Sequence, residues 1–315
     1  MSRKDVVEAR ERIGALVQRT PLVETQIRGA RVWLKCECLQ TGGAFKLRGA
    51  TNRLLLLDEN ERRQGVVAFS SGNHARGVAI AARRLGIKAI IVMPADAPTV
   101  KIEGTRSEGA EFVFYDRTRE DREEIAANLA AKSGATVVPS FDDKRIVAGQ
   151  GTVGLEIAEQ LADMGQPTPR RIVVPTGGGG LASGIALACP DAAIVCVEPA
   201  GWDDMGRSLE AGEIVPVASD APPTLCDALQ TPLVSPITFG ILRDRRAITL
   251  AVSEDEVFAA MRFAWSGHQL VVEPGGAVAL AALLAGKLAP EEGTVAILSG
   301  GNVDPALHAR IVGAA

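Results

Sequence analysis

The stretch that decides the fold is VVAFSSGNH, residues 66–74, in which four apolar residues lead directly into a turn of small and polar ones. A helical pattern follows at 75–85, and the same alternation continues to residue 138. Continuous apolar strands that alternate with helices are typical of a parallel sheet covered on both faces. We therefore expect an α/β fold, with strands at 66–69, 89–92, 112–115 and 136–138 and helices at 75–85, 98–108 and 118–132.

A similar alternation on either side of this region predicts a second sheet. Strands are expected at 31–37, 171–174, 194–197, 247–252 and 294–298, and helices at 3–19, 47–57, 146–164, 181–189, 253–267 and 276–285. The stretch 199–236, rich in Pro, Gly and Asp, is expected to be irregular. Because no flexible linker separates the two series, we predict two open, twisted, mostly parallel sheets flanked by helices. A small α/β domain at 52–143 is inserted into a large cofactor-binding domain formed by 1–51 and 144–315.

Composition favours a small molecule as the partner. The 315 residues carry a formal net charge of −4, which gives no general attraction to nucleic acid or to an anionic membrane. Five cysteines form an odd set without the paired spacing of a zinc site, and we expect reduced, mostly buried thiols. With no apolar run of membrane-spanning length, the prediction is a cytoplasmic protein that uses neither membrane nor nucleic acid.

Three further turns of small residues follow strand-like runs, where an α/β protein exposes its ligand-binding loops. They are TGGAFK at 41–46, GGGG at 177–180 and SGGN at 299–302. Consecutive glycines before a helix let backbone N–H groups converge on a phosphate, although a simple tight turn stays open as the alternative. The glycines lack both the P-loop pattern and the GxGxxG spacing, which disfavours a nicotinamide dehydrogenase.

Single side chains in these turns suit the ring of a cofactor. Lys46 ends the first turn at the head of a helix, and Ser299 is placed to bond a ring nitrogen. The amide of Asn73 can donate to a ring oxygen, or can do no more than cap its helix. The neighbouring backbone N–H groups at 70–72 could hold a substrate carboxylate. An amine, a phosphate loop and two ring partners together predict a pyridoxal-phosphate site.

These motifs, AFKLRGA at 44–50, SSGNH at 70–74, GGGG at 177–180 and SGGN at 299–302, resemble those of the serine/threonine dehydratase and serine racemase family. The resemblance spans nearly the whole chain and implies a fold-type II pyridoxal-phosphate enzyme, tryptophan synthase beta-like, that forms a homodimer. It implies that the cofactor is held by Lys46 as Schiff base, Phe45, Asn73, Gly177, Gly178, Gly179, Gly180 and Ser299. It implies that the substrate is held by Ser70, Ser71, Gly72, Asn73 and His74.

The implied reaction is the β-elimination of L-threonine or L-serine to a 2-keto acid and ammonia, with Lys46 as general base. Ser71 matches the opposite-face acid/base of serine racemases, but a helix cap is an equal interpretation. An amino-acid racemase or a 3-hydroxyaspartate dehydratase is the alternative. Arg119 and Arg122 lie where some relatives pair an arginine with a second carboxylate, although surface pairs within a helix are the commoner role. A catalytically silent ligand-binding protein is disfavoured by the intact Lys46.

A divalent cation site is the last implied feature. Glu198, Asp204 and the backbone oxygen of Trp202 match a segment that binds a cation in serine racemase-like relatives. Such oxygen ligands suit Mg²⁺ or Ca²⁺, while solvated loop charges are the alternative interpretation. Glu273 also matches a family position near the cofactor, and its role is open.

Overall fold

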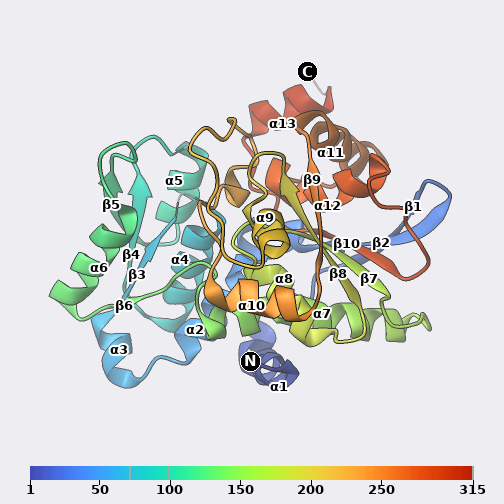
Figure 1. Ribbon diagram of the computed structural model, residues 1–315. Coiled ribbons are helices and arrows are strands. Elements are labelled where there is room, and N and C mark those ends of the chain that lie inside the picture. The colour runs from blue at the N-terminus through green and yellow to red at the C-terminus, as the bar shows by residue number, and fades with distance from the viewer. Residues whose placement is uncertain (71, 98, 314–315) are drawn as a thin grey trace.

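The computed structural model describes residues 1–70, 72–97 and 99–313. It contains two mostly parallel sheets flanked by helices, which confirms the predicted fold class. Figure 1 shows the four-stranded sheet on the left and the six-stranded sheet on the right, with helices on both faces of each.

The six-stranded sheet has the order β1-β2-β10-β7-β8-β9, and only β1 runs antiparallel to its neighbour. Ile172 and Val174 pack among the helices of one face, whereas Val173 between them packs among those of the other. Both faces are therefore buried, which explains the continuous apolar strands. The strands are β1 (Leu22–Ile27), β2 (Ala30–Cys36), β7 (Arg171–Pro175), β8 (Ala193–Pro199), β9 (Ile248–Val252) and β10 (Thr294–Leu298).

Eight helices accompany this sheet within the described ranges. Those on the two faces include α7 with α8, and α11 with α12. Their bounds are α1 (Arg3–Ile13), α7 (Lys144–Asp163), α8 (Gly180–Ala188), α9 (Asp204–Ala211), α10 (Pro236–Asp244), α11 (Glu254–His268), α12 (Pro274–Leu284) and α13 (Pro305–Val312).

The four-stranded sheet is parallel throughout, in the order β5-β4-β3-β6. Its strands are β3 (Val66–Phe69), β4 (Ala89–Pro94), β5 (Glu111–Tyr115) and β6 (Thr136–Val137), and its helices are α2 (Lys46–Leu55), α3 (Glu59–Gln64), α4 (Asn73–Leu85), α5 (Thr99–Arg106) and α6 (Arg122–Ser133). All four strands lie within the predicted small domain; its boundaries at 52 and 143 stay a prediction.

Helices α2, α7 and α8 touch backbone to backbone through glycines. A Cβ on Gly149 of α7 would lie 2.7 Å from the Cα of Gly49 on α2. A Cβ on Gly184 of α8 would lie 2.5 Å from the nitrogen of Gly151 on α7. No side chain fits at these contacts, so the three helices are held at the closest spacing that a backbone allows.

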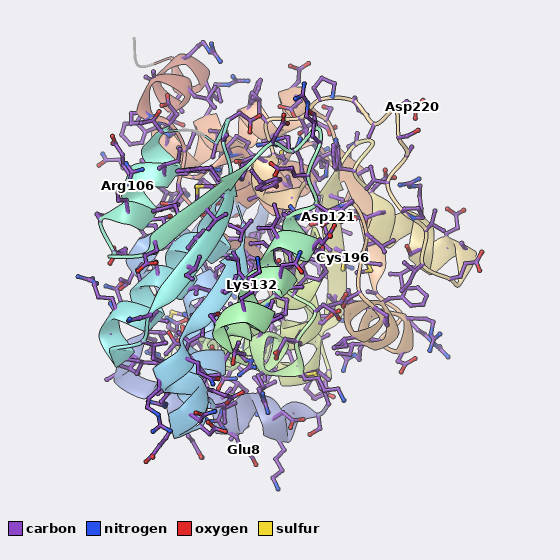
Figure 2. The ribbon with its side chains drawn as sticks, turned by 90° about the vertical axis from the view of Figure 1, so that its left-hand side faces the viewer. Glu8, Arg106, Asp121, Lys132, Cys196 and Asp220 are labelled. Atoms are coloured by element: carbon purple, nitrogen blue, oxygen red, sulfur yellow. The ribbon has the colours of Figure 1, made fainter. Side chains whose placement is uncertain are left out.

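The structure corrects several local expectations. The stretch expected to be irregular contains α9, and α3, α10, α13 and β1 were not predicted. Helix α6 begins four residues later than expected, because the side chain of Asp121, labelled in Figure 2, accepts bonds from the N–H groups of Glu123 and Glu124. All five cysteines lie in the described ranges, buried and without a disulfide. Among the described residues, no helix combines the length and apolarity needed to span a bilayer.

Candidate active site

The four sequence motifs meet at one cavity of about 340 Å³. Its wall combines the ends of β3, β7 and β10 with the first residues of α2, α4 and α8. Of the predicted site residues that are described, those in the wall are Phe45, Lys46, Ser70, Gly72, Asn73, His74, Gly177–Gly180 and Ser299. Ser71 lies outside the described residues. The carboxyl ends of parallel strands therefore bring these segments together, as the sequence predicted.

Lys46 is the first residue of α2 and its amine faces the cavity. Its Nζ donates a hydrogen bond to the carbonyl oxygen of Ser140 at 3.2 Å and lies 5.2 Å from the centre of the Phe45 ring. Burial lowers the pKa of Lys46 to about 8, although the nearby Glu273 carboxylate acts to raise it. A neutral amine is the form that attacks a carbonyl, so this shift favours Schiff-base chemistry near neutral pH.

Ser299 lies beside Lys46 because backbone contacts join their segments. The carbonyl oxygen of Ser299 accepts a bond from the N–H of Phe45 at 3.2 Å, and Ala44 forms an isolated β-bridge with Gly300. Ser299 itself is 5% exposed, directly after β10. Ser299 and Lys46 both line the cavity, and these backbone contacts hold their two segments together.

Two residues after Lys46, Arg48 belongs to the buried charge cluster, which is formed by Lys35, Glu37, Arg48 and Glu156. Arg48 donates to both oxygens of Glu37 and to both oxygens of Glu156, at 2.7–2.8 Å. Lys35 donates to Glu156 at 2.7 Å. Two cations and two carboxylates are thus paired away from water, and they fix the first turn of α2 to β2 and α7.

The glycine loop joins β7 to α8. Gly179 has a φ of +82°, which only glycine adopts without strain. A Cβ on Gly178 would lie 2.4 Å from the ring of Phe141, and one on Gly177 would lie 2.9 Å from the hydroxyl of Thr231. The loop is therefore a bare backbone cradle at a helix N-terminus, and its N–H groups suit a phosphate.

Asn73, in the cavity wall, contacts the buried Glu273. The Nδ2 of Asn73 donates a hydrogen bond to Oε1 of Glu273. The other oxygen of Glu273 has no partner among the described residues, and burial raises the pKa of this carboxyl to about 7. A buried polar atom without a partner indicates that a further group belongs there. The lysine, the bare glycine loop and this carboxyl together fit pyridoxal phosphate.

His74 is neutral and held in place. Its Nε2 lies 2.8 Å from the carbonyl oxygen of Val138, and burial together with nearby Lys46 lowers its pKa to about 3. We therefore expect the His74 imidazole to be uncharged, so that it forms no ion pair with a substrate.

The two candidate arginines differ in placement. Arg119 is exposed and its guanidinium lies 3.7 Å from Asp116. Arg122, the first residue of α6, lines the cavity, with its guanidinium 5.7 Å from the centre of the Phe69 ring. Only Arg122 can meet a substrate in the cavity.

The predicted cation ligands lie apart from this cavity. Both oxygens of Glu198 accept backbone bonds, from Met205 and Gly206 at 2.9 Å. Both oxygens of Asp204 are buried without a partner in the described part of the chain, and burial raises its pKa to about 7 and that of Glu198 well above its usual range. Trp202 is half-buried, and its indole N–H donates to Pro222. No group of three or more His, Cys, Asp or Glu side chains that could hold a metal occurs among the described residues.

The structure adds cavity residues that the sequence had not indicated. Ser140 and Phe141 follow β6. Ligand-binding loops follow the carboxyl ends of parallel strands, and this rule could have indicated these two residues as well. Lys101 and Asp227 form an ion pair in the cavity wall, and the Lys101 amine would lie 3.4 Å from a Cβ on Gly72. No short motif marks such a pair, because its partners lie far apart in sequence.

An amine at the head of a helix, facing a glycine loop on two mostly parallel sheets, is the arrangement of fold-type II pyridoxal-phosphate enzymes. The chain belongs to this family: residues 13–300 match the family described as "Pyridoxal-phosphate dependent enzyme". Pyridoxal phosphate is therefore its cofactor.

Relatives in the family include both lyases and racemases. L-threo-3-hydroxyaspartate ammonia-lyase from Pseudomonas sp is 43% identical over 317 residues, which covers 98% of this chain and 97% of that protein. Serine racemase from Schizosaccharomyces pombe is 38% identical and covers 98% of this chain and 96% of its own length. The crystal structure of a threonine deaminase from T.th. superimposes with a TM-score of 0.89 at 42% identity, covering 96% of this chain and 99% of that one. The chain is thus similar to enzymes of elimination and racemisation.

Proposed function

We propose that this protein is an ammonia-lyase that converts L-threonine or L-serine to a 2-keto acid and ammonia. The observation that carries the proposal is the Lys46 amine, with a pKa of about 8, beside Ser299 in the cavity. A hydroxyl at the ring nitrogen leaves that nitrogen largely unprotonated, which favours rapid elimination over a long-lived carbanion.

In this proposal each motif has one task. The glycine loop holds the phosphate, Asn73 donates to the ring oxygen, and the backbone at 70–72 binds the substrate carboxylate. When bound, pyridoxal phosphate withdraws electrons from the substrate Cα. The amine of Lys46 would take the Cα proton as general base, and the β-hydroxyl would take up a proton and leave as water. Hydrolysis of the released aminoacrylate then gives the 2-keto acid and ammonia.

A second candidate is 3-hydroxyaspartate, favoured by Arg122. A guanidinium in the cavity wall can pair with the extra carboxylate of this substrate. We expect Arg122→Ala to lower kcat/KM for 3-hydroxyaspartate about 10- to 100-fold relative to threonine, since one charge-assisted bond is lost. Arg119→Ala, which removes an exposed arginine of the same segment, is the matched control and should leave the ratio unchanged.

A racemase is the remaining alternative, in which Ser71 acts as an acid on the opposite face. Serine racemases among the relatives support it. It differs from the lyase by its product, because a racemase yields a D-amino acid without keto acid.

Three further assignments belong to the proposal. Mg²⁺ or Ca²⁺ binds between Glu198, Asp204 and the backbone oxygen of Trp202, where the unpartnered oxygens of Asp204 suit a hard cation. The two domains divide at 51/52 and 143/144. The enzyme is a cytoplasmic homodimer. Light scattering of the purified protein would test its oligomeric state.

The experiment begins with the visible absorbance of the purified protein, before and after borohydride. We expect a yellow absorbance band from the bound cofactor, which Lys46→Ala should lack. Borohydride should attach the cofactor covalently to Lys46, and peptide mass mapping would locate the modified residue. Lys132→Ala, an exposed lysine on α6 labelled in Figure 2, is the control. Threonine, serine and 3-hydroxyaspartate are then assayed separately for keto acid and for chirality. D-amino acid without keto acid would refute the lyase, and an adduct on another lysine would refute the site.

A further inference from the structure

Asn302 connects three segments of the active site. Its Nδ2 donates to the carbonyl oxygen of Gly42 at 2.8 Å and to Oδ1 of Asn73 at 2.7 Å. Its Oδ1 accepts from Nη1 of Arg76 at 3.0 Å. The side chain therefore joins the loop before Lys46, the start of α4 and the loop after β10.

Arg76 and the carbonyl oxygen of Gly42 together decide which way the Asn302 amide faces, because one only donates and the other only accepts. The two ends of an amide have nearly the same shape, so their orientation follows from their partners. A guanidinium can only donate, so the end of Asn302 that meets Arg76 is the oxygen. The NH2 group of Asn302 then faces Asn73. Among the described residues Arg76 forms no ion pair, and its Nε has no hydrogen-bond partner.

Asn302 in turn orients the amide of Asn73. Its Oδ1 accepts from Asn302, so its NH2 group faces the other way, toward Glu273. A cation stands at one end of this chain of amides and a carboxyl at the other, and both favour the same orientation. One N–H of Asn73 meets Glu273, which leaves the second N–H for the cavity.

We propose that Asn302, anchored by Arg76 and the Gly42 carbonyl, is a positioning residue that fixes the amide of Asn73 with its NH2 group toward the cofactor. This inference rests on the proposed contact between Asn73 and the ring oxygen. A reversed Asn73 would present a carbonyl oxygen to that oxygen and lose a charge-assisted bond.

Asn302→Asp tests this directly. The new carboxylate keeps Arg76 but only accepts, so Asn73 must turn its NH2 group toward it. We expect the dissociation constant for pyridoxal phosphate to rise about tenfold, as for the loss of one hydrogen bond to a charged group. We also expect the pH midpoint of the cofactor's visible absorbance to move upward, because the ring oxygen keeps its proton longer without a donor.

Asn52→Asp is a matched control. Arg12 donates to Oδ1 of Asn52, and its Nδ2 donates to the carbonyl oxygen of Arg145 at 2.6 Å, so the local chemistry is the same. Asn52 does not line the cavity. We expect it to change thermal stability without moving the absorbance midpoint or the cofactor affinity.

A second pair of variants covers the case in which Asn302→Asp does not fold. Arg76→Lys keeps a group that only donates and should preserve the midpoint, whereas Arg76→Met removes one of the two groups that orient the Asn302 amide and should shift the midpoint less than Asn302→Asp does, because the Gly42 carbonyl still accepts. Unchanged absorbance and affinity in Asn302→Asp, or equal midpoints in the two Arg76 variants, would overturn the inference. If borohydride attaches the cofactor to Lys46 in the wild type and the absorbance midpoint does not shift in these variants, only this inference fails. If the reduced cofactor is found on another residue, the proposed site fails as well.

Discussion

Among the substitutions considered in this Discussion, we expect removal of one carboxylate from the buried charge cluster to lower the free energy of unfolding most. Glu156 accepts from Nη1 and Nη2 of Arg48 at 2.7 and 2.8 Å and from Lys35 at 2.7 Å. The side chains of the three residues are 0–1% exposed. Glu156→Gln keeps the shape but leaves two buried cations with Glu37 as their only carboxylate in the cluster.

The magnitude follows from the loss of charge balance. Breaking a buried ion pair from one side costs about 3–5 kcal/mol, because the remaining charge stays out of water. The amide oxygen of glutamine still accepts one bond, so we expect a loss near the lower end, about 3 kcal/mol. That is a large share of the roughly 5–15 kcal/mol by which a folded domain is stable.

The assay is urea unfolding of the cofactor-free protein, followed by far-ultraviolet circular dichroism. Glu159→Gln is the matched control, since Glu159 lies on the same helix, is 48% exposed and is 3.5 Å from Arg10. It should change the free energy of unfolding by less than about 1 kcal/mol. If the two variants differ by less than about 1 kcal/mol, the cluster does not stabilise the fold as argued.

Three further outcomes follow from the site. Gly178→Ala places a methyl group against the Phe141 ring and should weaken cofactor binding by the equivalent of about 1–3 kcal/mol, whereas Gly240→Ala, with open space around it, should leave the binding constant unchanged. Because the pKa of Lys46 is lowered to about 8, the rate at which the cofactor-free protein takes up pyridoxal phosphate should rise with pH and level off near 8; a rise that continues to the usual 10.5 would contradict this. Mg²⁺ at 100 times its dissociation constant should stabilise the wild type by about 2.7 kcal/mol and Asp204→Asn far less, in thermal melts with and without the ion; equal stabilisation of both would exclude this ligand.

The sequence predicted the alternating core well because buried parallel strands carry an uninterrupted apolar signal. The strands at 66–69 and 294–298 have the predicted bounds. Helix α9 escaped prediction because its sequence, DMGRSLEA, contains a glycine, and its first N–H groups are satisfied by Glu198 on β8, which lies outside the usual capping position. Such a cap depends on tertiary structure and leaves no local pattern.

The residues of the site also divide into those marked by a local sequence pattern and those brought together only by the tertiary structure. Motifs at strand ends could be read as a cofactor site, because the rule that brings strand ends together needs only the order of elements. The pairing of Lys35 with Glu156, or of Asn302 with Asn73, depends on which side chains meet across the fold. Sequence separation of more than a hundred residues hides such partners.

The glycine contacts between α2, α7 and α8 have a consequence for how this protein can diverge. Lys46 begins α2 and Gly180 begins α8, with α7 between them. The separation of the amine from the phosphate loop is therefore set by the thickness of bare backbone rather than by the choice of side chains. Mutational drift at the surface leaves that length unchanged, whereas one added methyl group at Gly149 or Gly184 alters it. A library scan should find these inner glycines intolerant even though neither lines the cavity.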